Sequence, residues 1–460
     1  MTRMAEVSVE TTPIDGMLVV RLQVHGDNRG WFKENWQREK MLALGLPDFQ
    51  PVQNNMSYNS ETGTTRGIHA EPWDKFISSA HGRYFGAWVD LREGPGFGTV
   101  FTCEVDESVA VFVPRGVGNA YQTLTEDVTY SYLVNDHWSA DQVSSYSYVN
   151  LADETIAIPW PIPLDRVQIS AKDLTHPRLA EARRVPALKT LILGGRGQLG
   201  QALAVEFPGA TSVDRDELDL TDEAQVEAWP WAEYDLVLNA AAWTNVDGAE
   251  TPDGRAGAWK ANAMVPAELA RIATRHRQTL VHVSSDYVFD GTKAAWTEED
   301  DLAPLSVYGQ SKAAGDLAVS VTPRHYLLRT SWVVGDGKNF LRTMADLAAR
   351  GVSPSVVDDQ VGRLTHTSNL AAAIAHLVRT KAPYGTYNCT DGGPEVSWAD
   401  IAKAVFVAAG RSADEVTPVS TESYYAGKGS HAPRPARSTL DLSKLEATGY
   451  VVPLYELGVL

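Results

Sequence analysis

The sequence of 460 residues has only two cysteines, Cys103 and Cys389, and no apolar run long enough to cross a bilayer. Two cysteines so far apart exclude a disulfide framework and indicate a reducing compartment. The first ten residues contain no apolar core of signal-peptide length. We therefore expect a cytoplasmic protein with no membrane partner.

Positive charge is scarce as well. The chain has 40 lysines and arginines against 58 aspartates and glutamates, which gives a formal net charge of −18. Such a chain has no bulk positive field to hold phosphate backbones, so no nucleic-acid partner is expected. A His-x-His pair followed by a carboxylate is also missing, and we predict no metal site of the kind found in many small β-barrels.

What remains is ordinary globular composition, 44% hydrophobic and 21% charged. A chain of this length predicts two or three domains. In the first part, short aromatic-rich runs alternate with Gly, Pro, Asn and Asp, as in 84–91, 109–113 and 128–134. Runs of this length are typical of an antiparallel sandwich or barrel.

A charged stretch at 177–190 indicates a linker, and the sequence pattern changes after it. Short buried strands are predicted at 236–239 and 280–284, and they alternate with helical patterns at 265–273 and 369–378. This alternation predicts a parallel, doubly wound sheet with helices on its faces.

A glycine-rich loop opens the second part, in Leu191-Ile-Leu-Gly-Gly-Arg-Gly-Gln-Leu-Gly200. Three apolar residues predict a strand, and an apolar run from Ala202 predicts the start of a helix. Gly194, Gly197 and Gly200 would let backbone N–H groups approach a pyrophosphate at the positive end of that helix. Glycine clusters also form ordinary turns, so the loop alone leaves nucleotide binding open.

Asp214 and Arg215 follow this loop at the distance where dinucleotide folds place a ribose-binding residue. An acid there would hold the 2′-hydroxyl of NADH, whereas an arginine would hold the 2′-phosphate of NADPH. Both are present, so the choice between NADPH and NADH stays open, as does the alternative that the pair is a solvated turn.

A more specific pattern is Tyr308-Gly-Gln-Ser-Lys312. Residues i and i+4 of a helix share a face, so the ammonium should lower the pKa of the phenol and make it a proton donor to a carbonyl oxygen. Ser285 follows a predicted strand and is placed to hydrogen-bond the same oxygen. An exposed Tyr–Lys pair is the alternative for the motif alone. Together with the glycine loop, these residues resemble the extended short-chain dehydrogenase/reductase family.

Longer motifs narrow this resemblance. They are Asn239–Glu250, Ser285–Gly291, Leu328–Trp332, Val357–Gly362 and Arg434–Ser438. From Leu188 nearly to its end, the chain resembles the dTDP-4-dehydrorhamnose reductase family. The resemblance implies an NADPH or NADH site formed by Gly194, Gly197, Gln198, Leu199, Gly200, Asp214, Arg215, Asp219, Leu220, Ala241, Ala242, Trp243, Tyr308 and Lys312. It implies Ser285, Tyr308 and Lys312 as catalytic residues, and substrate contacts from Ser285, Asp286, Trp332 and Arg434.

The first part carries, in order, the motifs Arg29–Glu34, Gln53–Ser57, Arg66–His69, Trp88–Arg92, Val113–Gly116 and Ser170–Asp173. On its own, a single histidine such as His69 is more often structural. The whole series resembles the dTDP-4-dehydrorhamnose 3,5-epimerase family, a metal-free jelly roll of the cupin type, over residues 13–180. By this resemblance His69 is the general base, oriented by Asp173, and Tyr132 is the general acid. Substrate contacts are implied for Arg29, Glu34, Gln53, Asn55, Arg66, Lys75 and Asn119.

The implied chemistry suits these residue types. A C4 ketone acidifies the protons on C3 and C5, and a histidine with an ordinary pKa near ~6.5 is suited to remove them. Lys75 or Arg66 would stabilise the enolate oxygen, which makes Lys75 a catalytic candidate as well. Tyr132 would then return a proton to the opposite face.

Several positions depart from the epimerase pattern. Asn119 replaces a histidine, Val143 replaces an acidic ligand, and His137-Trp138 replaces a pair of tyrosines. The loop between His69 and Lys75 is also short. A changed substrate preference, or epimerisation at one carbon only, is therefore an open alternative.

We thus expect a cupin-type jelly roll at 1–180, a linker at 181–187 and an α/β Rossmann-like domain at 188–460. The predicted enzyme is bifunctional: it epimerises dTDP-4-dehydro-6-deoxy-D-glucose at C3 and C5 and reduces the C4 ketone with NADPH or NADH. The alternatives are the same reactions on another dTDP-deoxysugar, a first half that only binds or dimerises, and a regulatory NADP-binding subunit. A homodimer through the jelly roll is expected by resemblance, and a Mg²⁺ requirement is not readable from the residues.

Overall fold

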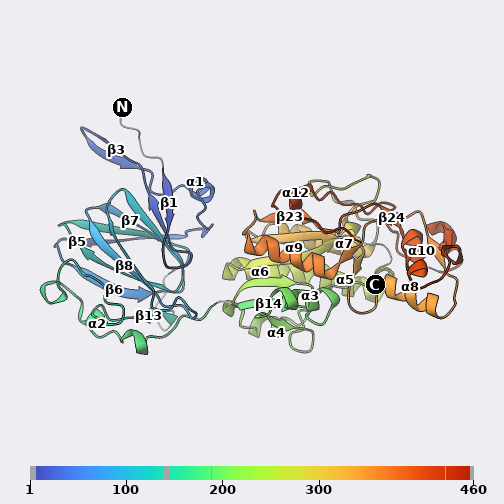
Figure 1. Cartoon of the computed structure of the whole chain (residues 1–460), viewed down its shortest axis with the longest axis horizontal. Helices are drawn as coiled ribbons and strands as arrows, with labels where there is room; N and C mark the ends of the chain where they lie inside the picture. The colour runs from blue at the N-terminus through green and yellow to red at the C-terminus, as the bar shows by residue number, and fades with distance from the viewer. Residues whose placement is uncertain (1–6, 138–144, 188, 430, 456–460) are drawn as a thin grey trace. The chain divides into compact units, whose positions relative to one another are not determined.

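The computed structural model describes residues 7–137, 145–187, 189–429 and 431–455. The chain divides into two compact units, Met1–Ala187 and Leu188–Leu460 (Figure 1). Each unit has hydrophobic clusters of its own. The predicted fold class, an all-β sandwich followed by an α/β domain with a parallel sheet, is confirmed.

The first unit is a sandwich of two antiparallel sheets, with strand orders β1-β2-β10-β7-β12-β5 and β13-β6-β11-β8-β9. The three aromatic-rich runs predicted as strands are β8, β10 and β12. A separate hairpin is formed by β3 and β4. The bounds are β1 (Ser8–Thr11), β2 (Leu18–Arg21), β3 (Val24–Asp27), β4 (Gly30–Lys33), β5 (Gln53–Asn59), β6 (Thr65–Ala70), β7 (Lys75–His81), β8 (Tyr84–Asp90), β9 (Val100–Val105), β10 (Val109–Val113), β11 (Val117–Thr123), β12 (Val128–Val134) and β13 (Ser147–Tyr148).

Strand β10 is buried on both of its faces. Its odd-numbered valines pack between the two sheets, whereas Ala110 and Phe112 belong to a cluster on the opposite face. Met41 of α1 (Arg38–Ala43) and Phe49 of the loop that follows this helix also belong to that cluster. A strand with two buried faces needs an unbroken apolar run, which is why 109–113 does not alternate with polar residues.

The last residues of the first unit run back along the jelly roll. Residues 181–185, assigned to a linker from the sequence, stay attached to it. The N–H of Val185 donates to the carbonyl of Leu91 at 2.7 Å, and the Val185 side chain is buried. Leu179, just before this stretch, is buried as well. The linker prediction is therefore wrong for these residues, because a few buried apolar side chains outweigh the charged composition around them.

In the second unit, six parallel strands form one sheet in the order β15-β14-β16-β17-β18-β23. The chain order reverses between β14 and β16, and sheets of this kind bind ligands at such a point, beyond the carboxyl ends of the strands. The bounds are β14 (Lys189–Leu193), β15 (Thr211–Val213), β16 (Tyr234–Asn239), β17 (Thr279–Ser285), β18 (His325–Thr330) and β23 (Gly385–Asn388). Short pairs elsewhere are formed by β19 (Val333–Val334), β20 (Ser355–Val357), β21 (Val361–Gly362), β22 (Thr365–His366), β24 (Val396–Ser397) and β25 (Thr417–Val419).

Helices cover both faces of this sheet (Figure 1). Leu191 and Leu193 of β14 share a cluster with Leu269 of α6, whereas Ile192 shares another with Leu203 of α3. None of the helices in the described ranges is long and apolar enough to span a bilayer. Their bounds are α2 (Ala171–Leu174, in the first unit), α3 (Gln198–Glu206), α4 (Glu223–Ala228), α5 (Pro252–Trp259), α6 (Val265–His276), α7 (Val307–Ser320), α8 (Phe340–Ala349), α9 (Thr367–Arg379), α10 (Trp398–Ala408), α11 (Thr421–Tyr425) and α12 (Ser443–Glu446).

Both cysteine thiols are sheltered and unpaired. Cys103 lies on β9 in the first unit, where burial raises its pKa to about 11. Cys389 lies in the second unit, and burial raises its pKa as well. Neither thiol is activated as a nucleophile, which agrees with the sequence-based view that both are small core residues.

Candidate active sites

The glycine loop joins β14 to α3 and packs tightly on itself. Gly194 has φ +77°, in the region that favours glycine. A Cβ on Gly200 would lie 2.2 Å from the carbonyl oxygen of Gly194, so a side chain there would force the loop open. Gly197 is the N-cap of α3, and the helix therefore begins at Gln198, earlier than the predicted Ala202. The first N–H groups of a helix lack partners within it, so this end of α3 suits a phosphate group.

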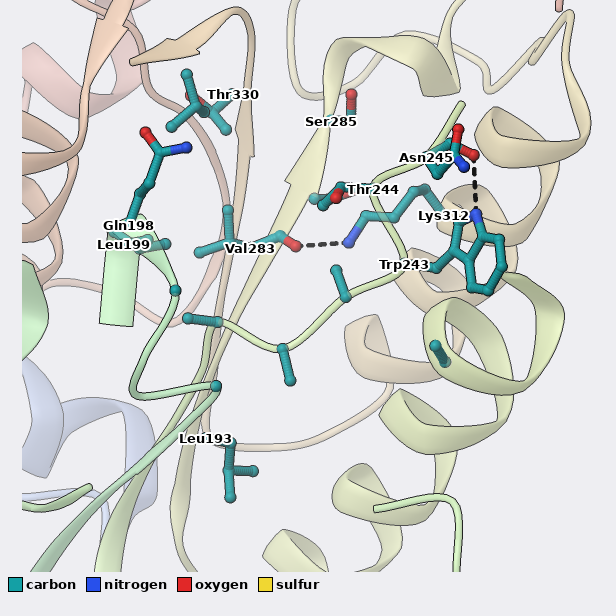
Figure 2. Close-up of a pocket in the computed structure, with 18 of the residues that line it drawn as sticks. Leu193, Gln198, Leu199, Trp243, Thr244, Asn245, Val283, Ser285, Lys312 and Thr330 are labelled. Atoms are coloured by element: carbon teal, nitrogen blue, oxygen red, sulfur yellow. Dashed lines mark hydrogen bonds between the residues drawn. The ribbon is translucent and has the colours of Figure 1, made fainter. Parts of the chain in front are cut away.

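A cavity of about 1030 Å³ lies beyond the carboxyl ends of β14, β16 and β17 (Figure 2). Gly200 and Arg434 are not among the described residues that line it: Gly200 supports the loop from within, and Arg434 pairs with Asp247 at 2.8 Å. The structure brings together around the cavity the predicted residues Gly194, Gly197, Gln198, Leu199, Asp214, Arg215, Asp219, Leu220, Ala241, Ala242, Trp243, Ser285, Asp286, Tyr308, Lys312 and Trp332.

Asp214 ties the glycine loop to the end of β15. Its Oδ2 accepts a hydrogen bond from the N–H of Arg196 at 3.0 Å, and its Oδ1 accepts one from the N–H of Arg215 at 2.8 Å. Burial alone would raise the pKa of this carboxyl, but the two N–H donors lower it. Arg196 also lines the cavity and was missed from the sequence, although its place inside the glycine loop was a usable signal.

Ser285, Tyr308 and Lys312 meet at one side of this cavity. Ser285 ends β17, and the other two lie one turn apart on α7, which begins at the N-cap Ser306. The ammonium of Lys312 donates to the carbonyl of Val283 at 2.6 Å (Figure 2). The i,i+4 prediction thus places the phenol and the lysine at the same cavity.

The pKa values of Tyr308 and Lys312 differ from those expected from the sequence. Burial raises the pKa of Tyr308 to about 12, and a hydrogen bond with Ser285 only partly opposes the rise. Burial also lowers the pKa of Lys312 to about 8, against the pull of Asp316. The expectation that the lysine lowers the phenol pKa does not hold in this geometry, because burial dominates the pKa of Tyr308 and Lys312 is not among the groups that shift it.

Polar and aromatic side chains line the part of the cavity that contains the predicted substrate contacts. Ser285 Oγ donates to Oδ1 of Asp286 at 2.9 Å, and burial raises the pKa of Asp286 to about 6. Trp332 has φ +45° and stacks on Trp398, the first residue of α10, with ring centroids 3.9 Å apart. Trp398 was missed from the sequence, because nothing in its local pattern distinguishes it from a core residue at a helix start.

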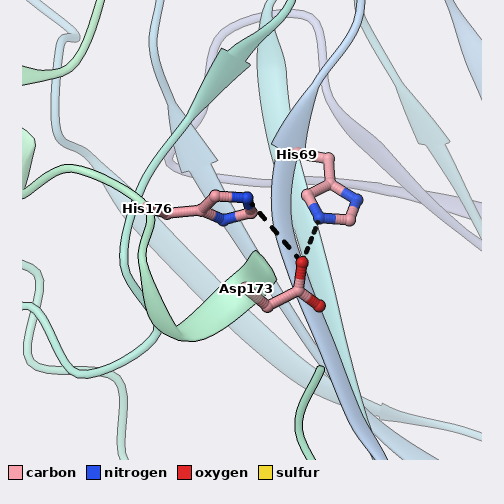
Figure 3. Close-up of side chains that lie close together, drawn as sticks. All are labelled: His69, Asp173 and His176. Carbon is pink, nitrogen blue, oxygen red and sulfur yellow. Dashed lines mark hydrogen bonds and ion pairs between the residues drawn. The ribbon is translucent and has the colours of Figure 1, made fainter. Parts of the chain in front are cut away.

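In the first unit, His69 lies on β6 and Asp173 on α2, which begins at the N-cap Ser170. Nε2 of His69 lies 2.9 Å from Oδ1 of Asp173, and the His69 side chain is 33% exposed against 5% for Asp173 (Figure 3). Burial opposes the charge on Asp173, but the hydrogen bond with His69 and the N–H of Gly67 lower its pKa. The resemblance alone had predicted this pair, and the structure brings it together. His176, which was not predicted, lies near the same oxygen, with Nε2 3.8 Å from Oδ1.

A second group lies between the two sheets. Lys75 of β7 is buried and donates to the amide oxygen of Asn119 on β11 and to the carboxylate of Glu71. Asn119 is also the cross-strand partner of His69, so the two side chains lie on the same face of the sheet. The Lys75 ammonium lies 6.0 Å from the ring centroid of Tyr132 on β12, whose pKa burial raises to about 12. The residues expected to be base, electrophile and acid thus come from both sheets.

The remaining predicted contacts are more scattered. Gln53 donates to Oδ1 of Asn55 at 2.8 Å along β5, and Arg66 of β6 donates to Oδ1 of Asn59 at 3.1 Å. Val143 and Trp138 lie outside the described residues. Arg29 and Glu34 form local ion pairs, with Asp27 and Lys40, and no described contact joins either of them to His69.

Comparisons with known proteins cover both units. Residues 11–181 match the model of a family described as dTDP-4-dehydrorhamnose 3,5-epimerase, and residues 188–459 match that of the RmlD substrate binding domain. Over 179 residues the chain is 49% identical to the protein RmlC homolog of Streptococcus pyogenes serotype M6, which covers 38% of this chain and 90% of the relative.

Two reductases match the other unit. The dTDP-4-dehydrorhamnose reductase of Aggregatibacter actinomycetemcomitans is 36% identical over 280 residues, which is 58% of this chain and 94% of the relative. The crystal structure of dTDP-4-dehydrorhamnose reductase from Bacillus anthracis in complex with NADP is 33% identical, with a TM-score of 0.54, and covers 58% of this chain and 95% of that one.

Proposed function

Because the chain belongs to the dTDP-4-dehydrorhamnose 3,5-epimerase family over residues 11–181 and to the RmlD substrate binding domain family over residues 188–459, we propose that it catalyses two consecutive steps of dTDP-L-rhamnose synthesis. The first unit epimerises dTDP-4-dehydro-6-deoxy-D-glucose at C3 and C5. The second unit reduces the C4 ketone of the product. The observation that carries the proposal is that one chain holds both a His–Asp pair beside a buried lysine and tyrosine, and a Ser–Tyr–Lys group beside a glycine loop.

In the first unit, His69 removes the proton on C3 or C5. Its Nε2 faces Asp173, which holds the ring and stabilises the imidazolium that forms. The electron pair of the broken C–H bond passes to the C4 oxygen, where the ammonium of Lys75 stabilises the enolate. Tyr132 returns a proton to the carbon from the opposite face, so that the configuration inverts.

In the second unit, Tyr308 donates the proton that completes reduction at C4. Ser285 positions the ketone oxygen, and Lys312 holds the ribose next to the reacting carbon. A nicotinamide dinucleotide, when bound, supplies the hydride. The residues present fit such a cofactor, because Gly194 and Gly197 line the cavity where α3 begins, and the first N–H groups of that helix can hold a pyrophosphate.

We propose NADPH rather than NADH as this cofactor. Arg196 and Arg215 both line the cavity beside Asp214, whose carboxylate oxygens already accept backbone hydrogen bonds. The guanidinium of Arg196 pairs with Asp216 and Glu217, whereas that of Arg215 suits a 2′-phosphate. Arg215→Ala should therefore lower kcat/KM with NADPH much more than with NADH. Equal losses with the two cofactors would contradict this preference.

We also propose that the jelly roll forms a homodimer through the edge of its larger sheet. Edge strand β5 carries Met56 and Tyr58, which are 66% and 62% exposed. Large apolar side chains on an unpaired edge favour pairing with a second copy. Light scattering should give twice the chain mass, and Tyr58→Lys should shift it toward the monomer. A monomeric wild-type chain would contradict this assembly.

Mass spectrometry of products formed in deuterated water tests the two activities together. Without NADPH, the full chain should incorporate deuterium at C3 and C5; with NADPH, it should yield a reduced sugar that retains both. Substrate that exchanges at neither carbon would make the first unit a binding or dimerisation module. Exchange without reduction would favour a regulatory NADP-binding subunit. Exchange at one carbon only would point to the altered position Asn119.

A further inference from the structure

A second histidine lies against the carboxylate of the first unit's His–Asp pair. Nε2 of His176 is 3.8 Å from Oδ1 of Asp173, the same oxygen that His69 contacts (Figure 3). One donor atom from each of His69, Asp173 and His176 lies within 4.8 Å of the others. Within the part of the chain that the structure describes, no other three histidine, cysteine, aspartate or glutamate side chains lie this close together.

The position of His176 is not explained by the epimerase mechanism. Its side chain is only 6% exposed, and neither ring nitrogen makes a hydrogen bond of ordinary geometry with the described residues, although the backbone of Gly67 interacts with the ring. The ring packs on Tyr148 with centroids 4.7 Å apart. A buried polar nitrogen without a partner destabilises the fold, which indicates that a ligand can satisfy it.

We propose that His69, Asp173 and His176 bind a divalent cation of the zinc type, and that this cation reversibly switches off the epimerase. Two imidazole nitrogens and one carboxylate oxygen are a donor set that zinc accepts, with a fourth position for water. Bonds of about 2.0–2.2 Å in a tetrahedron place donor atoms about 3.3–3.6 Å apart. The two separations from Asp173, 2.9 and 3.8 Å, each need to change by only a few tenths of an ångström. The partly exposed ring of His69 leaves a path to the site.

The inhibition follows from where one proton sits, and it rests on the proposed role of His69. As a base, neutral His69 keeps its proton on Nε2, facing Asp173, and has a lone pair on Nδ1. A cation bound at Nε2 forces that single proton onto Nδ1. The ring then has no free lone pair with which to accept a proton from C3 or C5. No bond of the substrate is broken, and removal of the cation restores the base.

The binding test does not depend on catalysis. Titration of the full chain with Co²⁺, a coloured substitute for zinc, should show visible ligand-field bands and one ion per chain. His176→Phe keeps a ring against Tyr148 but offers no ligand, and His176→Gln is a second variant in case the first does not fold. Both should weaken binding at least ~10-fold. No binding by the wild-type chain, or unchanged binding in a folded variant, would overturn the proposal.

The activity test uses deuterium exchange at C3 and C5. Zinc should inhibit exchange by the wild-type chain, and a chelator should restore it. In His176→Phe, the same zinc concentration should leave exchange near that variant's own metal-free rate, while reduction by the second unit serves as an internal control. Equal inhibition of wild type and variant would overturn the switch. Absence of exchange by the metal-free wild-type chain would instead contradict the proposed function, and the cobalt titration would still decide the metal site.

Discussion

The first unit assembles its candidate site between two antiparallel sheets, with side chains from β6, β7, β11 and β12, whereas the second gathers its residues beyond the edge of one parallel sheet. In the sandwich, His69 meets a partner 104 residues away. In the parallel sheet, Tyr308 and Lys312 lie one turn apart on a single helix. A sandwich must close before its site exists, while a strand–loop–helix unit carries much of its site locally.

The two sites also differ in their contact with water. His69 keeps a third of its side chain exposed, but Lys312 is 2% exposed. This difference suits the chemistry proposed for each. Proton exchange at carbon needs a base that can return its proton to solvent, whereas hydride transfer benefits from a site that excludes water.

The largest expected effect comes from removing the proposed base of the first unit. His69→Ala should lower deuterium incorporation at C3 and C5 by about 10⁴-fold, the upper end for general acid–base groups. Reduction of pre-epimerised substrate should continue, because His69 belongs to the first unit and the second unit has its own site. Mass spectrometry measures the first rate and NADPH absorbance the second. Exchange at the wild-type rate would remove His69 from the mechanism.

The reciprocal change is made in the second unit. Tyr308→Phe should lower reduction by about 10³-fold, because the proton donor is lost while the ring remains. Affinity for NADPH, measured by fluorescence titration, should be retained, and so should deuterium exchange by the first unit. Turnover like that of the wild type would show that another group donates this proton.

A smaller effect separates exchange from inversion. Tyr132→Phe should lower inversion by about 10²-fold but affect deuterium exchange less, because His69 can return a deuteron to the face from which it took the proton. Proton NMR coupling constants report the configuration, and mass spectra report the exchange. Equal loss of both would indicate that Tyr132 holds the substrate rather than protonating it.

Alkaline pH should affect the second unit in two opposite ways through Lys312. Its folded-state pKa is about 8, whereas an unfolded lysine has a pKa near ~10.4. Between these values the unfolded chain binds more protons, so this residue makes the free energy of unfolding rise with pH. Reduction should fall over the same window as the ammonium loses its proton.

The control for this behaviour is Lys312→Met, which has no proton to lose. Urea unfolding, followed by hydrogen exchange of the second unit, measures its free energy of unfolding. This free energy should rise with pH more steeply in the wild-type chain than in the variant. Parallel curves for the two chains would mean that the folded-state pKa of Lys312 is not lowered.

The smallest expected effect comes from separating the units. A fragment that begins at Leu188 should fold and reduce pre-epimerised substrate at the rate of the full chain, since this unit has its own core and its own cavity. The steady-state rates of fragment and full chain provide the measurement. A soluble but inactive fragment would show that the units share a site.

Local patterns predicted much of the fold. The run 109–113 and the strand at 128–134 match β10 and β12 to the residue, because a buried strand is specified by adjacent side chains. The linker prediction was wrong for residues 181–185 for the converse reason: Val185 is held by a partner far back in the chain, at Leu91. Composition describes a segment by itself and does not report such a contact.

In the two sites, too, local spacing was predictable from the sequence, whereas features that depend on the folded unit were not. The spacing of Tyr308 and Lys312 was readable because four residues make one helical turn, yet their pKa values were not, because burial depends on the whole unit. The pairing of His69 with Asp173 could be predicted only from a family resemblance. His176 follows Asp173 by three residues, but His69 joins these two only in the folded sandwich, so the spacing of the sequence indicates only part of the proposed metal site.

The two sheltered thiols make this chain a convenient background for spectroscopic labels. Cys103, with a pKa of about 11, is almost entirely protonated at neutral pH, and Cys389 is buried. A cysteine introduced at an exposed position in each unit, such as Glu154 or Glu299, whose side chains are 79% and 87% exposed, should therefore react with maleimide dyes first. Energy transfer between two such labels would then follow the separation of the units during turnover, in a chain that keeps its native thiols.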